Sequence, residues 1–334
     1  MAKKIRVAVI GAGNMGRHHA RNYFEMETTE LVAIADTDIK NKALAKKYRA
    51  NFYEDYRELL SLEKPEIVNV CVPTLWHKEV ASEAVKAGAN VLVEKPIASS
   101  LAEAQDLIDL AKEKKVKLTV GHIERFNPVV LLLKELIKKG KLGKIISVMA
   151  RRANPIPARI KDANVILDIG VHDIDLINFI LDKKPVTVHA YGGRALLQKQ
   201  EDYADILLEY PKDEQGLKVT GHIQVNWLTP VKIRKLNVTG TKGYAVLNLI
   251  TQELVLFDTK YTHEFDDYQD YVGKFKETKG RLIPVKSGEP LKLELEDFVK
   301  SIQRNREPLV RPEDGFEALR IALEATKSIK RRRI

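Results

Sequence analysis

The sequence predicts an α/β protein of two domains, and the patterning of its apolar residues carries that prediction. Residues 1–123 alternate short apolar runs with helical patterns, which is typical of a doubly wound parallel sheet covered by helices. In residues 124–334, apolar and polar positions alternate over long stretches, which indicates a large, open and mostly antiparallel sheet with helices on one side. A chain of 334 residues is long enough for each domain to bury a core of its own.

The first domain begins with an apolar strand, residues 7–10, which runs into a turn of the form Gly-x-Gly-x-x-Gly. A helical pattern over residues 14–26 follows, and a second apolar strand, residues 31–35, ends on Asp36. This order of strand, glycine turn, helix, strand and acid is the fingerprint of a Rossmann dinucleotide-binding domain. The sequence therefore predicts that this domain binds a nicotinamide dinucleotide.

Each part of the fingerprint has a physical task. Gly11 allows the tight turn, Gly13 lets the backbone approach a pyrophosphate, and Gly16 lets the helix pack close to the strand. The helix start at Asn14 and Met15 presents unpaired N–H groups and a partial positive charge to the phosphates.

Asp36 distinguishes between the two nicotinamide dinucleotides. Its carboxylate can accept hydrogen bonds from both hydroxyls of an adenosine ribose, and its negative charge would repel a 2′-phosphate. The expected cofactor is therefore NAD rather than NADP.

Three further strands and two helices complete the first domain. The strands are expected at residues 66–71, 90–94 and 117–121, and the helices at residues 76–87 and 101–114. The single cysteine, Cys71, is interpreted as a buried strand residue, and one cysteine excludes an internal disulfide.

The second domain is expected to contain the following elements in order: a helix at 128–139, a strand at 144–151, a helix at 168–181, strands at 186–194, 202–210, 217–227, 231–239, 243–249 and 254–258, and helices at 291–304 and 315–329. Because a large open sheet leaves one face uncovered, we expect a homo-oligomer, either a dimer or a tetramer.

Composition excludes a membrane protein. Hydrophobic residues make up 44% of the chain and charged residues 31%, as in a water-soluble globular protein. No apolar run approaches the roughly 20 residues of a membrane span, and no apolar secretory core follows Lys3 and Lys4. We therefore expect a cytoplasmic protein with no membrane partner.

The formal net charge of +10 suggests an anionic partner, which could be a nucleic acid, a membrane surface or a phosphorylated small molecule. The one cluster of basic residues is the tail, residues 330–333, and a solvated tail is the more common interpretation of such a run. The sequence contains no helix-turn-helix signature, so no nucleic-acid partner is expected. The charge is compatible with a diphosphate substrate but does not select one.

A first candidate for chemistry is the corner Glu94-Lys95-Pro96, at the end of a buried strand. Ligands of an open parallel sheet bind beyond the carboxyl ends of its strands, so Lys95 should project into the same crevice as the glycine turn. There it can donate to a substrate oxygen and stabilise developing negative charge. A cis peptide before Pro96 would fix the corner that aims the lysine. The alternative is a surface lysine that caps a strand end.

A second candidate is the helical segment that contains Asp168 and His172. On an α-helix these two residues share a face, and a carboxylate beside an imidazole fixes its tautomer and raises its basicity, as a general base requires. Two alternatives stay open. The histidine could be a metal ligand together with Asp168 or Asp175, or the pair could simply brace the start of the helix.

A third candidate is the crossover between the domains. Arg125 and Asn127 are plausible contacts for a substrate or a ribose, and Arg151 and Arg152 could pair with phosphate oxygens. A salt bridge between the domains is an equally plausible role for each of them.

Together these motifs resemble the glucose-fructose oxidoreductase, inositol dehydrogenase and rhizopine-catabolism family, abbreviated Gfo/Idh/MocA. The resemblance covers the whole chain and is carried by residues 11–16, 71–77, 94–96 and 168–173. In that family the lysine of Glu-Lys-Pro and a later Asp-x-x-x-His pair form the catalytic set. The resemblance therefore implies catalytic roles for Lys95, Asp168 and His172. No metal is expected, because no further His or Cys near His172 has ligand spacing.

The resemblance also implies further contacts with the cofactor. The family's loop after the third strand lies along the nicotinamide half of NAD, which corresponds here to Pro73, Thr74 and His77. Glu94 and Lys95 of the Glu-Lys-Pro corner are expected to contact the cofactor as well.

The reaction implied is the oxidation of a CH–OH group of a sugar, with NAD as hydride acceptor. In this hypothesis His172 is the base, oriented by Asp168, and Lys95 polarises the reacting oxygen. The reverse, with Lys95 as base and His172 as helper, stays open because sequence spacing does not fix geometry.

Residues 121–128 and 168–173 look most like the branch of the family that acts on nucleotide-linked amino sugars, the UDP-N-acetylglucosamine 3-dehydrogenases. The implied substrate is a UDP-linked sugar. A dehydrogenase of a free sugar or polyol such as inositol is the alternative. A third hypothesis is a sensing protein that kept the dinucleotide fold without turnover, and the presence of all three catalytic residue types argues against it.

Overall fold

The computed structural model describes residues 3–157, 163–258, 261–265, 271–275 and 279–331. The chain divides into two compact units. The first unit comprises Met1–Phe126 and Glu289–Arg320, and the second comprises Asn127–Gly288 and Ile321–Ile334.

The first unit is built on a six-stranded parallel sheet with the strand order β3-β2-β1-β4-β5-β6. Its strands are β1 (Ile5–Ile10), β2 (Thr29–Ala35), β3 (Asn51–Tyr53), β4 (Ile67–Val70), β5 (Asn90–Val93) and β6 (Leu118–Val120). The chain order reverses between β1 and β4, and ligands of open α/β sheets bind outside the strand ends at such a point. The expected Rossmann architecture is confirmed.

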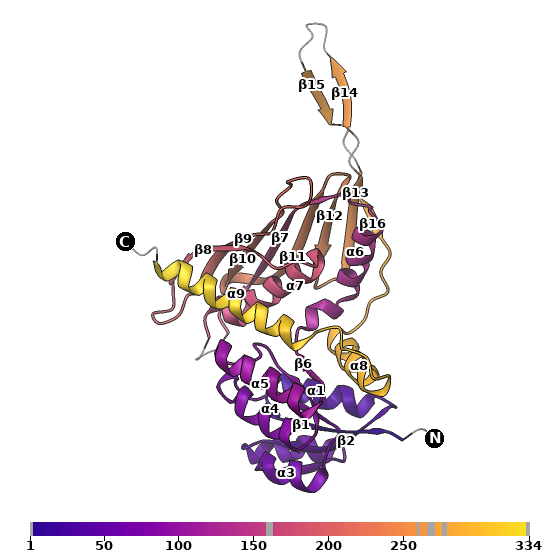
Figure 1. Cartoon of the computed structure of the whole chain (residues 1–334), viewed down its shortest axis with the longest axis vertical. Helices are drawn as coiled ribbons and strands as arrows, with labels where there is room; N and C mark the ends of the chain where they lie inside the picture. Colours follow the sequence, from indigo (N-terminus) through magenta and orange to yellow (C-terminus); the bar gives the residue numbers. More distant parts are fainter. Residues whose placement is uncertain (1–2, 158–162, 259–260, 266–270, 276–278, 332–334) are drawn as a thin grey trace. The chain divides into compact units, whose positions relative to one another are not determined.

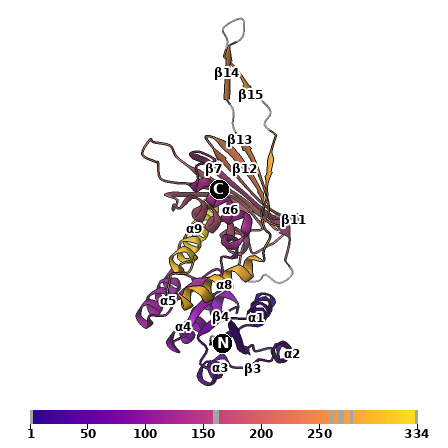
Figure 2. The ribbon, with the colours of Figure 1, turned by 90° about the vertical axis from the view of Figure 1, so that its right-hand side faces the viewer.

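Helices cover both faces of this sheet. Figure 2 shows α4 and α5 on one side and α1 on the other. The helices are α1 (Asn14–Glu25), α2 (Lys42–Lys47), α3 (Tyr56–Glu63), α4 (His77–Lys86) and α5 (Leu101–Lys114), with short 3₁₀ turns η1 (Ile39–Asn41), η2 (Thr74–Trp76) and η3 (Ile123–Phe126). The elements η1, α2, β3 and α3 were not predicted from the sequence. These elements are short, and β3 is an edge strand without a fully buried residue. Neither the helical nor the strand spacing of apolar residues was therefore visible in the sequence.

Helix α8 (Pro290–Gln303) belongs to the first unit, although the predicted boundary assigned it to the second domain. Its buried residues Leu291, Leu295 and Phe298 join the hydrophobic cluster that also contains residues of β1, α1 and β2. Glu289, just before α8, accepts a hydrogen bond from Asn22 of α1. The amphipathic pattern of α8 was recognised, but the pattern could not reveal which domain supplies its partner.

The second unit is built on an eight-stranded sheet with the order β16-β13-β12-β11-β7-β10-β9-β8. Its strands are β7 (Ile145–Pro155), β8 (Thr187–Gly193), β9 (Tyr203–Glu209), β10 (Thr220–Asn226), β11 (Leu228–Gly240), β12 (Gly243–Asn248), β13 (Glu253–Asp258) and β16 (Arg281–Ile283). The pair β7–β10 is parallel and the other described pairs of this sheet are antiparallel, so the expected second fold is confirmed.

Helices α6 (Pro128–Lys138) and α7 (Val171–Leu181) lie on one face of the eight-stranded sheet (Figure 1). The predicted alternation in β10 is confirmed, since Ile223 and Val225 are buried whereas His222 and Gln224 are exposed. The last helix, α9 (Pro312–Arg331), groups with the first unit up to Arg320 and with the second from Ile321 onwards.

Strands β14 (Tyr261–Phe265) and β15 (Tyr271–Phe275) pair with each other in a separate antiparallel hairpin (Figures 1 and 2). Neither this hairpin nor β16 was predicted from the sequence. Within the described residues, no helix is long and apolar enough to cross a membrane.

Candidate active site

The glycine turn after β1 has the geometry that the fingerprint requires. Gly11 has a φ of +89°, and a Cβ there would lie 2.7 Å from the carbonyl carbon of Cys71. A Cβ at Gly16 would lie 1.8 Å from the carbonyl oxygen of Gly11. A Cβ at Gly13 would meet nothing within 4 Å. The fold itself therefore needs glycine at positions 11 and 16, whereas position 13 faces open space in which a ligand could lie.

Helix α1 begins directly beyond this turn, with Gly13 as its N-cap. In the part of the chain that the structure describes, no side chain caps this helix start and no acidic residue lies in its first turn. The first N–H groups and the positive end of the helix dipole are therefore available to an anion. The residues present fit the pyrophosphate of a dinucleotide.

Asp36, just beyond β2, lies against the glycine turn. Its Oδ2 accepts a hydrogen bond from the backbone N–H of Ala12 at 2.6 Å, and its Oδ1 accepts one from Asp38 at 2.8 Å. Each carboxylate oxygen has a second lone pair that can accept a ribose hydroxyl. The ribose contact stays a prediction.

The Glu-Lys-Pro corner lies at the same edge of the sheet as the glycine turn. Strands β1, β4 and β5 are consecutive neighbours and run parallel, so Gly11, Cys71 and Glu94 all follow carboxyl ends of adjacent strands. Two strand spacings correspond to roughly 10 Å. Lys95 is half-buried, and the peptide between Lys95 and Pro96 is cis, as expected.

His77 joins the loop after β4 to this corner. Its Nδ1 lies 2.7 Å from the carbonyl oxygen of Pro96, and its Nε2 lies 2.9 Å from that of Val72. The side chain is buried, and burial lowers the pKa of His77 more than the two carbonyls raise it. Because both ring nitrogens face backbone carbonyls, the structure favours a bracing role for His77 over the predicted cofactor contact. Pro73 is exposed and Thr74 is half-buried, and their cofactor contacts stay predictions.

The Glu94 side chain is buried and hydrogen-bonded on both oxygens. Oε1 lies 2.8 Å from Nε2 of His19, and Oε2 accepts the Lys95 backbone N–H at 3.3 Å. Burial by itself would raise the pKa of Glu94, but the hydrogen bond from His19, together with the nearby Lys95 and His77, brings that pKa below its usual value. Glu94 is therefore held as a carboxylate next to the candidate catalytic lysine.

Two further buried residues continue from His19, and sequence reasoning missed them. Asn69 Nδ2 lies 2.6 Å from His19 Nδ1, and the Tyr23 hydroxyl donates to Asn69 Oδ1 at 2.9 Å. All three side chains are fully buried. A signal was present in the sequence, because Asn69 is a polar residue inside the apolar strand β4.

In the second unit, Asp168 lies in a π-helical turn (Ile166–Gly170), and His172 lies in the first turn of α7. The predicted shared face assumed α-helical spacing, which this segment does not have throughout. Both side chains are half-buried. Their pairing stays a prediction, and π-helical turns are frequent at functional sites.

Asn164 holds the start of the π turn. Its Oδ1 accepts the backbone N–H groups of Ile166 and Leu167 at 3.1 and 3.0 Å, and its Nδ2 donates to Glu201 and Thr326. This cap was not predicted from the sequence.

Arg152 holds the start of α7. Its Nε and Nη2 donate to the two oxygens of Asp173 at 2.8 and 2.9 Å, and both side chains are 2% exposed. A buried two-point pair favours a structural role over the predicted phosphate contact. The alternative prediction for Arg152 was a salt bridge between the domains. Arg152 does form a salt bridge, but its partner Asp173 belongs to the same unit.

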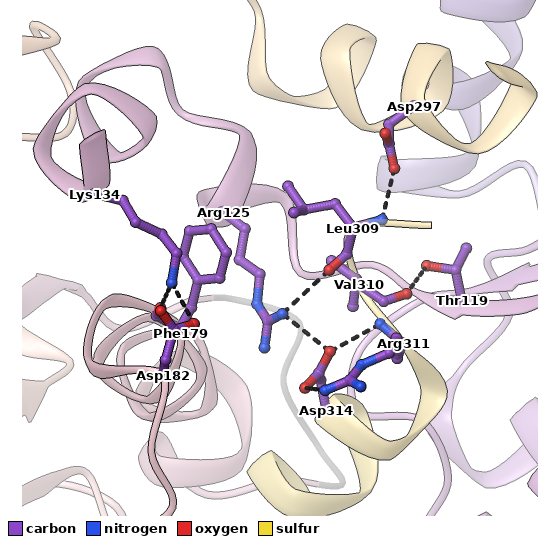
Figure 3. Close-up of polar contacts among 10 residues, drawn as sticks. All are labelled: Thr119, Arg125, Lys134, Phe179, Asp182, Asp297, Leu309, Val310, Arg311 and Asp314. Atoms are coloured by element: carbon purple, nitrogen blue, oxygen red, sulfur yellow. Dashed lines mark hydrogen bonds and ion pairs between the residues drawn. The ribbon is translucent and has the colours of Figure 1, made fainter. Parts of the chain in front are cut away.

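Arg125 and Asn127 also have structural partners. Arg125 is buried, and its Nη1 donates to Asp314 at 3.0 Å and to the carbonyl of Leu309 at 3.4 Å, all within the first unit (Figure 3). Asn127, in the second unit, donates to the carbonyl of Leu249 and caps α6 through Val129. The buried guanidinium of Arg125 and the buried amide of Asn127 are thus hydrogen-bonded within the protein. The structure therefore favours structural roles for both residues over the predicted substrate contacts.

Arg151 differs from the other three residues because it is exposed. It lines a hollow of about 410 Å³ on the uncovered face of the eight-stranded sheet, together with Met149, Tyr191 and His222. Successive residues of a strand point to opposite faces, which is why Arg151 and Arg152 have different surroundings. Among the residues that the structure describes, no group of three or more His, Cys, Asp or Glu could hold a metal ion.

The first unit has a Rossmann fold with a glycine turn that is open to a ligand, and a lysine lies at a neighbouring strand end. These features define a nicotinamide-dinucleotide oxidoreductase. The chain belongs to the Gfo/Idh/MocA family of oxidoreductases, which are NAD-binding proteins with a Rossmann fold. The model of the NAD-binding domain matches residues 5–122, and the model of a C-terminal domain matches residues 130–246.

Similar proteins include dehydrogenases of sugars and polyols. The chain is 25% identical over 327 residues to UDP-N-acetylglucosamine 3-dehydrogenase of Acidithiobacillus ferrooxidans, with 98% of this chain and 97% of the relative covered. It is 26% identical over 342 residues to an NAD-dependent scyllo-inositol 2-dehydrogenase of Bacillus subtilis, with 99% and 95% covered. The solved structure of the Acidithiobacillus enzyme has the same fold, with a TM-score of 0.84, 24% identity and coverage of 98% and 99%.

Proposed function

We propose that the protein oxidises a ring hydroxyl of a nucleotide-linked amino sugar, with a reaction like that of UDP-N-acetylglucosamine 3-dehydrogenases. The observation that carries the dehydrogenase chemistry is the position of Lys95, two strands from the glycine turn at the same sheet edge. The likeness to the Acidithiobacillus enzyme over nearly the whole chain supports the substrate class.

Each candidate residue has one task in this proposal. Lys95 donates a hydrogen bond to the reacting oxygen and stabilises its developing charge. His172 removes the hydroxyl proton as general base, and Asp168 orients its ring. Bound NAD supplies the hydride acceptor.

Replacement of Lys95 by arginine tests whether Lys95 is the hydrogen-bond donor or the base. Arginine keeps donors and a positive charge but cannot act as a base. If Lys95 is the donor, Lys95→Arg retains more activity than Lys95→Ala. Equal loss in both variants would favour Lys95 as the base and His172 as its helper.

The substrate is tested by following the absorbance of reduced nicotinamide while free and UDP-linked sugars are added to purified protein with NAD. We expect reduction with a UDP-linked amino sugar and competition by UDP alone. A free sugar or polyol such as inositol is the second candidate, and the scyllo-inositol dehydrogenase at 26% identity favours it. Reduction by inositol without competition by UDP would replace the nucleotide-sugar proposal with this one.

We also propose a homo-oligomer that uses the uncovered face of the eight-stranded sheet. Met149 and Tyr191 on this face are 54% and 62% exposed, and large exposed apolar side chains that gather on one face are typical of an interface. Light scattering of the purified protein and of Tyr191→Glu tests this. A monomeric wild-type protein would contradict the proposal.

A further inference from the structure

We propose that His19, Asn69 and Tyr23 form a positioning relay, which holds Glu94 so that the Glu94-Lys95-Pro96 corner receives the nicotinamide half of the cofactor. The inference rests on the proposed function, because that function requires a dinucleotide at the glycine turn. The relay joins α1 and β4 to the residue that follows β5, and all its members lie in the first unit.

The direction of each hydrogen bond follows from the carboxylate end. Ionised Glu94 can only accept, so His19 must carry its proton on Nε2, 2.8 Å from Glu94 Oε1. Asn69 Nδ2 lies 2.6 Å from His19 Nδ1, and because an amide NH₂ can only donate, Nδ1 accepts. This orients the amide so that Asn69 Oδ1 accepts the Tyr23 hydroxyl at 2.9 Å. The chain of donors thus has a single orientation, from Tyr23 towards Glu94.

The surroundings leave the carboxylate little freedom. His19, Asn69 and Tyr23 are each 0% exposed, and Glu94 is 7% exposed. A Cβ at Gly121, the residue after β6, would lie within 3.2 Å of all three carboxyl atoms of Glu94, so the backbone there closely approaches the carboxylate. The second oxygen of Glu94 accepts the N–H of Lys95, which ties the relay to the backbone of the corner.

A relay of this kind does more than fill the core. A buried chain of apolar side chains would pack α1 onto β4 equally well, and buried polar groups cost stability unless every partner is present. Here three side chains connect to one carboxylate at a carboxyl strand end, which is where the cofactor of this fold binds. Its effect should therefore appear at the nicotinamide end of the cofactor and not at the adenosine end.

The decisive pair of variants is His19→Gln and His19→Met. Both side chains are unbranched and similar in length, but only glutamine can donate to Glu94. We expect His19→Met to weaken NADH binding by about tenfold, since a donor to a charged acceptor is lost, while the affinity for ADP-ribose changes little. His19→Gln should restore most of the NADH affinity. Both affinities are measured by titration calorimetry and need no substrate.

The pH dependence gives a second readout. Glu94 faces His19 from α1, Cys71 beyond β4, His77 from α4 and its neighbour Lys95. Without the His19 donor, burial remains and raises the pKa of Glu94, so the carboxylate is neutralised at a higher pH as the pH falls. NADH affinity should therefore decline at a higher pH in His19→Met than in the wild type, with His19→Gln between them.

Thr119→Val is the matched control. Thr119 on β6 is buried in the same unit and donates to the carbonyl of Val310 at 2.8 Å, outside the relay (Figure 3). The substitution removes a buried hydrogen bond without changing the side-chain shape. It should lower stability but leave the ratio of NADH to ADP-ribose affinity unchanged.

Nitrogen NMR of labelled histidine in the wild-type protein tests the relay without any variant, and Tyr23→Phe tests it with a minimal change. We expect the ring of His19 to carry its proton on Nε2, facing Glu94, and Tyr23→Phe to reduce the NADH affinity slightly with ADP-ribose unaffected. The relay is refuted if His19 carries its proton on Nδ1 or on both nitrogens, if His19→Met keeps the wild-type affinity ratio, or if Thr119→Val changes that ratio equally. A confirmed relay in a protein that oxidises none of the sugars would instead contradict the proposed function alone.

Discussion

The two units hold their candidate catalytic residues by different means. In the first unit, Lys95 follows a central strand, and the parallel ladder of β1, β4 and β5 fixes its place relative to the glycine turn. In the second unit, His172 follows a π turn, and side chains fix that segment: Asn164 caps its start, and the Arg152–Asp173 pair anchors the first turn of α7. Strand topology positions one candidate, and a buried polar network positions the other.

This difference determines which substitutions each candidate should tolerate. A ladder of backbone hydrogen bonds does not depend on any single side chain. A buried network loses its geometry when one member is removed, because the remaining polar groups are left without partners. The backbone position of Lys95 should therefore be less sensitive than that of His172 to substitutions outside the reacting residues, whereas substitutions in the relay of the first unit should change cofactor binding through the Glu94 carboxylate.

The largest expected effect is the loss of turnover in Lys95→Ala and His172→Ala. Proton transfer and charge stabilisation each typically contribute a hundredfold or more, so each variant should lose about two to four orders of magnitude in kcat. NAD affinity, measured by titration, should change little. Lys86→Ala, which removes an exposed lysine of the first unit, serves as the control. Near-normal turnover in either alanine variant on the true substrate would show that its residue has been misassigned.

The next largest effect concerns the network of the second unit. Arg152→Ala leaves Asp173 buried without its two-point partner, which typically costs about 3–5 kcal/mol of unfolding free energy. Arg151→Ala, at the exposed neighbouring position, should change stability by no more than about 0.5 kcal/mol. Urea denaturation of both variants measures this. A stable Arg152→Ala protein that no longer responds to UDP would instead restore the phosphate-binding role.

The contrast between the units also explains what the sequence could predict. Five of the six strands of the first sheet were recognised because burial on both faces produces continuous apolar runs, and Lys95 followed from the rule that strand ends meet at one edge. The roles of Arg125 and Arg152 were not recognised. Their partners, Asp314 and Asp173, lie 189 and 21 residues away, and no local pattern pairs an arginine with a distant buried carboxylate.

Elements with few buried residues were also missed. The segment from η1 to α3 consists of short elements, and its strand β3 has no fully buried residue, so it lacks the periodic burial that makes a helix or strand visible in a sequence. The hairpin strands β14 and β15 are also short. The π turn was predicted as ordinary α-helix because its widening leaves no mark on residue type. Tertiary packing decides such details, and single-sequence patterns do not contain it.

A smaller effect is expected from a pair of glycine variants in the first unit. Gly13→Ala places its methyl group in open space, so the protein should fold normally but lose NAD affinity by at least about tenfold if the pyrophosphate lies there. Gly16→Ala places a methyl group 1.8 Å from a backbone oxygen and should instead destabilise the unit itself. Thermal unfolding and NAD titration separate the two outcomes. An unchanged NAD affinity in Gly13→Ala would mean that the cofactor does not approach this turn.

The smallest effect concerns the choice between NAD and NADP. Asp36 is held against the turn by the N–H of Ala12, and its negative charge should exclude a 2′-phosphate. We expect the wild type to prefer NAD. Asp36→Ala should narrow the gap between the NAD and NADP affinities, because it removes both the hydrogen bonds to the ribose and the repulsion of the 2′-phosphate.

Asp36→Asn separates these two contributions, since asparagine keeps an acceptor for the Ala12 N–H but carries no charge. If repulsion sets the preference, Asp36→Asn gains several-fold in NADP affinity while NAD affinity falls only modestly. Comparable affinities of the wild type for the two dinucleotides, measured by the same titration, would remove the role of Asp36 in cofactor choice.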